Sequence, residues 1–549
     1  MTAVTGAVTG AVTGGVVACV ERLAADAGAA ILRAGGNAAD AAVAVAFAQG
    51  VVDPIYCGIA GGFHGLFHDR ASGRTQVVSA GGRAPLAARE DMWRPKDRWG
   101  AMWTVEGNRN RLGYQASMTP GFVRGAHEAF ARFGSGRVGW RQLIEPAIAL
   151  AGEGFEVYPY LYRLWMPRTD RMVNFLESEE GTTVLGFTPA CREIYLHPDG
   201  SVYEIGERLV QRDYARTLER IADQGPDEFY EGETARRMAD DFQANGGLLT
   251  LEDLRTFQAD VGEPLQATFR DLTVLTEPAP TVGPVTVELL NILEGWDLRA
   301  LGWNSPAYLD RLARAMQLAF RDRLTLLGDP GFVDVGDDRM VSKAYAAELR
   351  AAIEAGNERE PAASRSGAPQ ETTHVSVMDR AGNAAAITHS IGMSSGVVTP
   401  GLGFQHNCHM VMFDPVPGRR NSIQPGKRPI TGGGPVLFSR GEEPYLLIGS
   451  PAGARKVTAL TQALLNHLDF GMPIQEAVAA DRIHAEDEPG VVIVEPHFDP
   501  ASLPGLARLG HRIRFDWYTA RLAAVLRDPA TGALSGGTDP RGDRGLAVV

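Results

Sequence analysis

The sequence is poor in the features that mark several common protein classes. It has four cysteines, scattered along the chain and without a CxxC pair: Cys19, Cys57, Cys191 and Cys408. This pattern fits neither a disulfide framework nor a structural zinc site, and it predicts buried free thiols in a reducing compartment. Basic residues are also fewer than acidic ones: the chain has 53 Lys and Arg and 66 Asp and Glu, for a formal net charge of -13. A general nucleic-acid binder normally shows a basic surface, so this balance argues against nucleic acid as a partner.

Long apolar runs are missing as well. A helix that spans a bilayer needs about 20 mostly apolar residues, whereas the most apolar segment, Ala38–Val52, is interrupted by Asp40 and Gln49. We interpret this segment as a helix buried between layers. The first residues, MTAVTGAVTGAVTGG, lack a basic region and a long apolar stretch, so they do not resemble a signal peptide. The sequence therefore predicts a soluble, cytoplasmic protein without membrane contact, whose residues 1–14 form a flexible tail.

Apolar side chains for a large core are present in quantity. The chain has 549 residues, of which 44% are hydrophobic and 22% are charged. This length allows two to four domains, or one large unit of helices and strands with insertions.

Helical patterns dominate from about Pro120 to Leu349, and two further helices are predicted near the start of the chain. A helix over Ala24–Arg33 is stopped by two glycines, and Asn37 caps a second helix that runs to about Gln49. The same reasoning predicts helices at 140–151, 214–222, 234–244 and 305–327, with a short strand at 273–276.

The chain changes character between residues 352 and 371. This segment, AIEAGNEREPAASRSGAPQE, has few large apolar groups, and we interpret it as an exposed connection. After it, alternating side chains from Thr373 and again from Ala384 indicate two strands, joined by a hairpin turn at Asp379–Gly382. An exposed segment therefore ends where a buried strand begins, at Thr372, and a processing site would be useful there.

Thr372 becomes a candidate catalyst if the chain is cut before it. Its own α-amine would then lie beside its hydroxyl, with an ordinary pKa of about 7.7–8.0, near the optimum for a general base at neutral pH. A threonine hydroxyl paired with an N-terminal amine is one known form of activated nucleophile. Two adjacent threonines are also common in strands, because threonine is β-branched, so the dipeptide Thr372-Thr373 alone leaves a purely structural role open.

Seven segments, in family order along the chain, resemble the γ-glutamyltranspeptidase family. They are Gly15–Pro54, Met118–Gly134, Phe229–Leu254, Leu326–Phe332, Thr372–Ser390, Pro425–Pro435 and Gly449–Val457. Each glycine-rich fragment is a weak signal by itself, but seven in order are a strong one. The resemblance implies a fold of the α/β (α+β) class, the four-layer αββα sandwich of N-terminal-nucleophile hydrolases, with two stacked sheets between helical layers.

The resemblance also implies a precursor that cuts its own Glu371–Thr372 bond. The large subunit, residues 15–371, and the small subunit, residues 372–549, would remain one folded unit. Thr372 would attack a carbonyl, and the acyl-enzyme would pass to water or to an acceptor amine. The backbone N–H groups of Ala452 and Gly453 would hold the oxyanion, and Ser390 aligns with a family threonine that hydrogen-bonds the nucleophile. No cofactor and no metal is implied, and a dimer of heterodimers is left open.

Most residues that bind the glutamyl group in this family are absent here. Gly81 stands in the register of the family's carboxylate-binding arginine, with Arg83 two residues later as a candidate carboxylate ligand or a surface ion pair. In the family, one segment supplies an acidic residue that binds the substrate amine. The corresponding segment of this chain has no carboxylate before Asp414. The other candidates for substrate binding are Asn407, Thr431 and Gly432.

These departures predict an amidohydrolase for a small, carboxylate-bearing amide. A site without an acid should not favour an ammonium group, because an unpaired buried charge is costly. Three alternatives remain: a γ-glutamyl hydrolase or transpeptidase that acts on glutathione-like amides, a hydrolase of carbon–carbon bonds in a biosynthetic pathway, and a non-catalytic binding protein. A metal site at His406 and His409 is less favoured, because no third ligand is evident.

Overall fold

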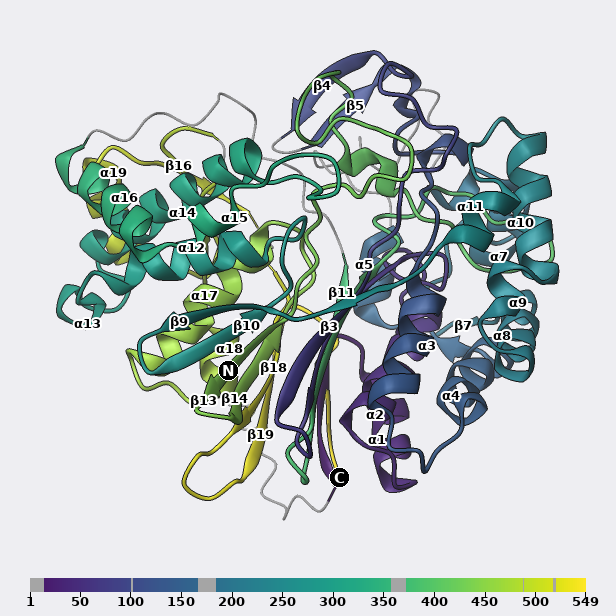
Figure 1. The fold of residues 1–549 in the computed structure, drawn as a ribbon, viewed down its shortest axis with the longest axis horizontal. Coiled ribbons are helices and arrows are strands. Elements are labelled where there is room, and N and C mark those ends of the chain that lie inside the picture. The colour runs from purple at the N-terminus through teal and green to yellow at the C-terminus, as the bar shows by residue number, and fades with distance from the viewer. Residues whose placement is uncertain (1–13, 100–101, 166–183, 357–371, 487, 517–519) are drawn as a thin grey trace.

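The structure is a computed structural model that describes residues 14–549, apart from residues 100–101, 166–183, 357–371, 487 and 517–519. Two large β-sheets lie face to face, and a layer of helices covers the outer face of each (Figure 1). This arrangement confirms the predicted four-layer αββα sandwich.

The first sheet joins strands from both sides of the predicted cut. Its seven strands follow the order β20-β1-β11-β12-β2-β3-β8. Their bounds are β1 (Gly15–Cys19), β2 (Gly62–Asp69), β3 (Arg74–Ala80), β8 (Asp260–Gly262), β11 (Thr373–Asp379), β12 (Ala384–Ser390) and β20 (Gly545–Val548). Strand β1 pairs antiparallel with β11 on one side and with β20 on the other. A chain cut before β11 would therefore still be held together by its main sheet.

The second sheet has six strands in the order β19-β18-β14-β13-β10-β9. Their bounds are β9 (Leu265–Phe269), β10 (Leu272–Thr276), β13 (Val436–Arg440), β14 (Glu443–Gly449), β18 (Ala523–Arg527) and β19 (Leu534–Thr538). Apolar side chains from alternate positions of both sheets fill the space between them, including Val16, Leu66, Met378, Leu447 and Val525. Burial of this inner layer, at about 25 cal/mol per Å2 of apolar surface, holds the sheets together.

The helical layer on the first sheet lies at the right of Figure 1. It includes α1 (Arg22–Arg33), α2 (Ala38–Val52), α3 (Phe122–Phe133), α4 (Trp140–Glu153), α8 (Arg212–Gln224) and α10 (Glu233–Ala244). All residues of α2 are buried, because this helix contacts β11 and β12 on one side and α1 and α4 on the other. Small alanines permit such close layers, and Asn37 caps the helix as predicted, accepting a hydrogen bond from the Asp40 N–H.

The helical layer on the second sheet lies at the left of Figure 1. It includes α12 (Gly283–Glu294), α14 (Pro306–Leu326), α16 (Lys343–Ala355), α17 (Arg455–Leu468) and α18 (Ile474–Ala479). The predicted start of the exposed connection at residue 352 is wrong. Helix α16 continues to Ala355, because Ile353 is buried, and it ends at Gly356 with a φ of 64°. The rest of that connection and residues 1–13 of the tail lie outside the described residues.

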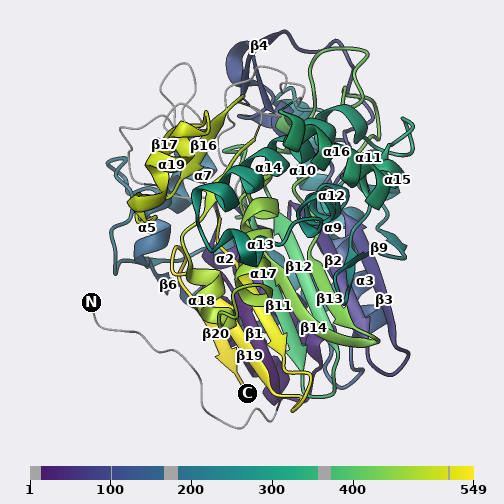
Figure 2. The same cartoon turned by 90° about the vertical axis from the view of Figure 1, so that its left-hand side faces the viewer.

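Smaller elements complete the described chain. The short strands are β4 (Pro95–Trp99), β5 (Met102–Val105), β6 (Phe155–Glu156), β7 (Arg208–Leu209), β15 (Ile483–His484), β16 (Val491–Val494) and β17 (Arg512–Phe515). The short α-helices are α5 (Pro159–Trp165), α7 (Pro189–Tyr195), α9 (Asp227–Tyr230), α11 (Leu251–Thr256), α13 (Leu298–Leu301), α15 (Asp337–Met340) and α19 (Leu503–Arg508). The 3-10 helices are η1 (Glu106–Asn108), η2 (Tyr114–Ala116), η3 (Val184–Gly186), η4 (His409–Met412) and η5 (Pro500–Ser502). Strands β16 and β17 and helix α19 lie together at one edge (Figure 2).

All four cysteines are buried and none forms a disulfide, in agreement with the sequence prediction. Across the ranges that the structure describes, none of the helices combines the length and the apolar character needed to cross a bilayer.

Candidate active site

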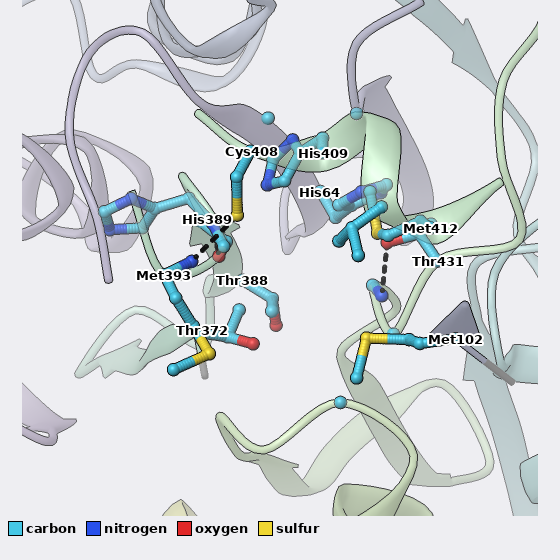
Figure 3. Close-up of a pocket in the computed structure, with 18 of the residues that line it drawn as sticks. His64, Met102, Thr372, Thr388, His389, Met393, Cys408, His409, Met412 and Thr431 are labelled. Atoms are coloured by element: carbon cyan, nitrogen blue, oxygen red, sulfur yellow. Dashed lines mark hydrogen bonds between the residues drawn. The ribbon is translucent and has the colours of Figure 1, made fainter. Parts of the chain in front are cut away.

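An open cavity with an empty volume of about 670 Å3 lies at the ends of β11, β12 and β2. The structure brings together in its wall five residues that the sequence singled out: Thr372, Ser390, Thr431, Gly432 and Gly453. The wall also contains Gly62, His64, Gly81, Met102, Arg111, Thr388, His389, Gly392, Met393, Cys408, His409, Val411, Met412 and Gly433. Figure 3 shows Thr372 and Thr388 close together, with Thr431 and Met412 across the cavity from them.

The register of the first sheet explains why distant residues meet here. Thr388 on β12 pairs with His374 on β11 and with His64 on β2, and His64 pairs with Ser79 on β3. Residues paired directly across strands point to the same face of a sheet. These four side chains therefore form one row, in which the His374 Nδ1 lies 2.8 Å from the Thr388 hydroxyl.

A second row, nearer the strand ends, contains the candidate nucleophile. Ser390 pairs with Gly62, and Thr373 pairs with His389, so the same register places Thr372 beside Ser390. Beyond Ser390 the row continues with Gly62, where an added Cβ would lie 2.5 Å from the Gly81 carbonyl oxygen. The two backbones therefore approach too closely here for a side chain at Gly62.

A buried polar cluster fixes the backbone on the far side of Thr372. Arg521, which is fully buried, donates to the Thr372 carbonyl at 3.3 Å. The Thr373 hydroxyl donates to Glu21 at 3.1 Å, and Gln49 donates to Glu21 at 2.6 Å and to the Thr373 hydroxyl at 2.8 Å. Burial raises the pKa of Glu21, and the Arg521 charge opposes that rise. The cluster holds the start of β11 without using the side chain of Thr372.

Ala452 and Gly453 form a turn between β14 and α17, and Gly453 lines the cavity. Within the described ranges, neither backbone N–H donates to a protein acceptor. Paired N–H groups of this kind stabilise the negative oxygen of a tetrahedral intermediate. Ala452 has a φ of 93°, in the region that favours glycine, and is almost completely buried. The alanine keeps the N–H, but in a backbone conformation that costs about 1–3 kcal/mol.

This strain predicts that two substitutions of Ala452 have different effects on kcat. Ala452→Gly retains the N–H and relaxes the backbone, so kcat should stay within about threefold of the wild-type value. Ala452→Val also retains the N–H, but a β-branched residue is a strong outlier at this φ, so the turn should shift. Loss of one oxyanion donor typically lowers kcat by about 100- to 1000-fold. A wild-type kcat for Ala452→Val would show that this turn does not contact the reacting group.

Ser390 has its hydroxyl oriented by neighbouring backbone. It accepts a hydrogen bond from the Gly392 N–H at 2.7 Å and donates to the Tyr56 carbonyl at 3.2 Å. Gly392 has a φ of 76°, and a Cβ there would lie 2.7 Å from the Cys408 sulfur. The cysteine thus occupies the space that a side chain at 392 would need.

Two predicted substrate-binding residues, Arg83 and Asn407, are not among the described residues that line the cavity. Arg83 donates to both oxygens of Asp260, at 3.2 and 2.9 Å. Asn407 is buried, and its amide donates to the carbonyls of Ala60 and Met118, at 2.8 and 2.9 Å. Its oxygen accepts from the Met118 N–H at 2.9 Å. Asn407 therefore joins three loop segments beside the cavity, and its amide is already satisfied by backbone.

Metal binding was weighed at two histidines, His406 and His409. Among the described residues, no three His, Cys, Asp or Glu side chains gather in a way that could hold a metal ion. His409 lines the cavity, whereas the His406 ring contacts Phe242 and Phe404 and its Nε2 lies 3.1 Å from the Thr399 hydroxyl. The two histidines thus have separate environments.

Lys456, in the first turn of α17, is completely buried just after the Ala452–Gly453 turn. Its Nζ donates to the Gly434 carbonyl at 3.0 Å. Burial lowers the pKa of Lys456 to about 7, and the negative charge of Glu277 opposes the shift. A cation near a helix N-terminus is also disfavoured by the helix dipole.

We expect Lys456 to give the free energy of unfolding a distinct pH dependence. The folded protein loses this proton near pH 7, whereas the unfolded chain keeps it up to about pH 10.5. Between these values the unfolded state binds more protons, so stability rises with pH, by up to about 1.4 kcal/mol per unit relative to Lys456→Met. Denaturant unfolding of both proteins at pH 7, 8 and 9 measures the difference. Equal slopes would mean that Lys456 keeps its ordinary pKa.

Sequence reasoning missed Thr388 and His64 as residues of the site. Thr388 was accessible to it, because it precedes Ser390 by two positions in a predicted strand and must share its face. His64 was not accessible, since its place in the row depends on the pairing of β2 with β12, more than 300 residues away.

Three features occur together here: a threonine at the start of a central strand, a cavity in an αββα sandwich, and a nearby turn with two N–H groups. This combination defines an N-terminal-nucleophile hydrolase. The family model described as gamma-glutamyltranspeptidase matches residues 24–549. The chain therefore belongs to the γ-glutamyltranspeptidase family.

Known relatives of this chain are acylases and glutathione hydrolases. It is 37% identical over 528 residues to the Acylase ACY 1 proenzyme of Pseudomonas sp. (strain SE83), covering 95% of this chain and 91% of that protein. It is 32% identical to the glutathione hydrolase proenzyme of Escherichia coli (strain K12), with 96% and 90% covered. The crystal structure of cephalosporin acylase from Bacillus halodurans matches with a TM-score of 0.87 and 28% identity, over 100% of this chain and 97% of that one.

These similarities identify the protein as an amidohydrolase or acyltransferase of this family, with large and small subunits that arise from one precursor. They do not favour a non-catalytic binding protein or a carbon–carbon hydrolase.

Proposed function

We propose that the Glu371–Thr372 bond cleaves itself and that Thr372 is then the nucleophile that removes a small, carboxylate-bearing acyl group from an amide. The observation that carries this proposal is the position of Thr372, in the wall of the cavity with Ser390 and Gly453. Glu371 lies outside the described residues. The family relationship supports the same threonine, because Thr372 begins one of the segments that resemble the family.

The geometry supports a mechanism in two half-reactions. The Thr372 amine accepts the hydroxyl proton while Oγ attacks the amide carbonyl. The N–H groups of Ala452 and Gly453 stabilise the oxyanion, and the ammonium returns its proton to the leaving nitrogen. Water then hydrolyses the acyl-enzyme, with the same amine as base. Because a free α-amine has a pKa of about 7.7–8.0, kcat/KM should rise with pH through that range.

The charge of the cavity supports an acyl group that carries a carboxylate and no ammonium. None of the described residues in its wall is an aspartate or a glutamate, whereas Arg111 is basic. Burial lowers the pKa of His389 and of His409 to about 3, so these two histidines are neutral at neutral pH. Burial lowers the pKa of Arg111 to about 10, so its guanidinium stays charged at neutral pH. An anion would be attracted to this wall, and an ammonium group would find no carboxylate there to pair with.

A panel of p-nitroanilides tests the proposal. Glutaryl, γ-glutamyl and pentanoyl groups share a five-carbon chain and differ in their carboxylate and ammonium groups. We expect self-cleaved enzyme to hydrolyse the glutaryl compound with a kcat/KM at least about tenfold above the γ-glutamyl compound, since burial of one unpaired ammonium costs at least about 1.4 kcal/mol. A preference for the γ-glutamyl compound would instead support action on glutathione-like amides. No turnover of any compound by cleaved protein would overturn the assigned substrate class.

A further inference from the structure

His64 separates the catalytic cavity from a second, smaller one. It lines both, and the smaller cavity, with an empty volume of about 260 Å3, is also lined by Ser79 and Arg428. The imidazole thus lies at the common boundary of the two cavities, and Thr372 lines the larger of them. Figure 3 shows the ring near His409 and Thr431.

A buried carboxylate holds this imidazole from one side. The His64 Nδ1 lies 3.0 and 2.9 Å from the two oxygens of Glu277, whose side chain is 2% exposed. A carboxylate on one ring nitrogen fixes the proton there and orients the other nitrogen. In the described part of the chain, the His64 Nε2 has no hydrogen-bond partner. One nitrogen is therefore anchored, and the other is available to a ligand.

Two glycines make room for the ring. A Cβ added to Gly81 would lie 2.6 Å from the His64 Cε1 and 2.7 Å from its Nε2, and one added to Gly433 would lie 2.5 Å from its Cδ2. Such contacts are shorter than van der Waals contact, so the imidazole occupies the volume that a side chain at 81 would fill. The ring therefore lies beside the Cβ position of residue 81, which the resemblance aligns with the family's carboxylate-binding arginine.

Several charged groups lie around His64. Glu277 is the carboxylate in contact with the ring, and Lys456 lies near it. Across the smaller cavity, Arg428 is already paired with Asp329 and Asp260, at 2.8 and 3.2 Å. His409 stays neutral, because burial, and then the His64 charge, lower its pKa to about 3. Of the two neighbouring imidazoles, only His64 has a carboxylate partner.

We propose that His64, held by Glu277, is a specificity-determining residue that donates from Nε2–H to the carboxylate of the acyl group. This inference rests on the proposed function. Donation from both ring nitrogens requires the imidazolium form, whose second proton comes from solvent and whose charge Glu277 balances. His64 acts in substrate binding, so its loss should raise KM more than it lowers kcat.

The test compares glutaryl and pentanoyl p-nitroanilides, which have the same length and differ in the terminal carboxylate. His64→Gln and Glu277→Gln should each lower kcat/KM for the glutaryl compound by about 13- to 160-fold, mainly through KM, which is the fold-change for the loss of one hydrogen bond to a charged group. Activity on the pentanoyl compound should stay within about threefold.

His68→Gln is the matched control, because His68 lies on the same strand and bonds Thr75, 3.0 Å away, outside the cavity. It should retain the preference of wild type. Equal losses on both compounds in His64→Gln and Glu277→Gln, or an unchanged preference, would overturn the role of His64 while the proposed function stands. Failure of cleaved wild-type protein to hydrolyse either compound would overturn the proposed function, and this inference with it.

Discussion

Thr372→Ala is expected to abolish both self-cleavage and turnover. Loss of the nucleophile lowers kcat of a hydrolase by about a millionfold in a well-studied case, so residual activity should not exceed background hydrolysis. Thr372→Ser keeps a hydroxyl and should retain measurable cleavage and turnover. Gel analysis of the purified chains and single-substrate kinetics measure the two effects separately.

Thr373→Ala is the matched control for this experiment. The Thr373 hydroxyl bonds Glu21 and Gln49 on the other face of β11, away from the cavity. Its removal should cost about 1–3 kcal/mol of stability, because Glu21 loses a buried donor, but cleavage and turnover should remain. Self-cleavage and turnover of Thr372→Ala at the wild-type level would contradict the assignment of the nucleophile.

Gly432→Ala is expected to lower kcat by about 100- to 1000-fold, the effect of losing one oxyanion donor. A Cβ at 432 would lie 2.8 Å from the Gly453 Cα and 3.1 Å from its carbonyl carbon. Both atoms are backbone, so the turn that carries the N–H groups must move. Because the change affects the transition state more than the bound substrate, KM should change little.

Gly262→Ala provides the matched control, since no atom lies within 4 Å of a Cβ there and its φ is ordinary. This variant should have wild-type kinetics. If Gly432→Ala folds, cleaves itself and has the kcat of wild type, the Ala452–Gly453 turn does not stabilise the oxyanion.

Much of the fold could be predicted from local sequence. The Asn37 cap and the alanine-rich run after it specify α2, and the alternation after Thr372 specifies the hairpin of β11 and β12. These features depend on neighbours within a few residues, where capping and periodicity act. The arrangement of the four layers was predicted from the resemblance of seven ordered segments to the family, and the structure confirms this arrangement.

The candidate site could be predicted only where its residues lie in those segments. Thr372, Ser390 and Gly453 do line one cavity. Arg83 and Asn407 also lie near recognisable segments, but their side chains are engaged by groups far away in sequence, Asp260 and Met118. His64 gains its position from strand pairing and from the missing side chain of Gly81. Such long-range register cannot be derived from a local pattern.

Several expectations stay predictions from the sequence. They are the cytoplasmic location, the dimer of heterodimers and the division of the chain at residues 371 and 372. The last of these matters most, because the mechanism depends on a free amine at Thr372.

The intact mass of the purified protein under denaturing conditions tests that claim most directly. The account predicts two chains for wild type, residues 1–371 and 372–549, with masses that sum to the 58.9 kDa precursor plus one water and with Thr372 as the N-terminus of the smaller chain. It predicts one uncut chain for Thr372→Ala. A single 58.9 kDa chain from folded wild-type protein would contradict the account, because Thr372 would then never gain its amine.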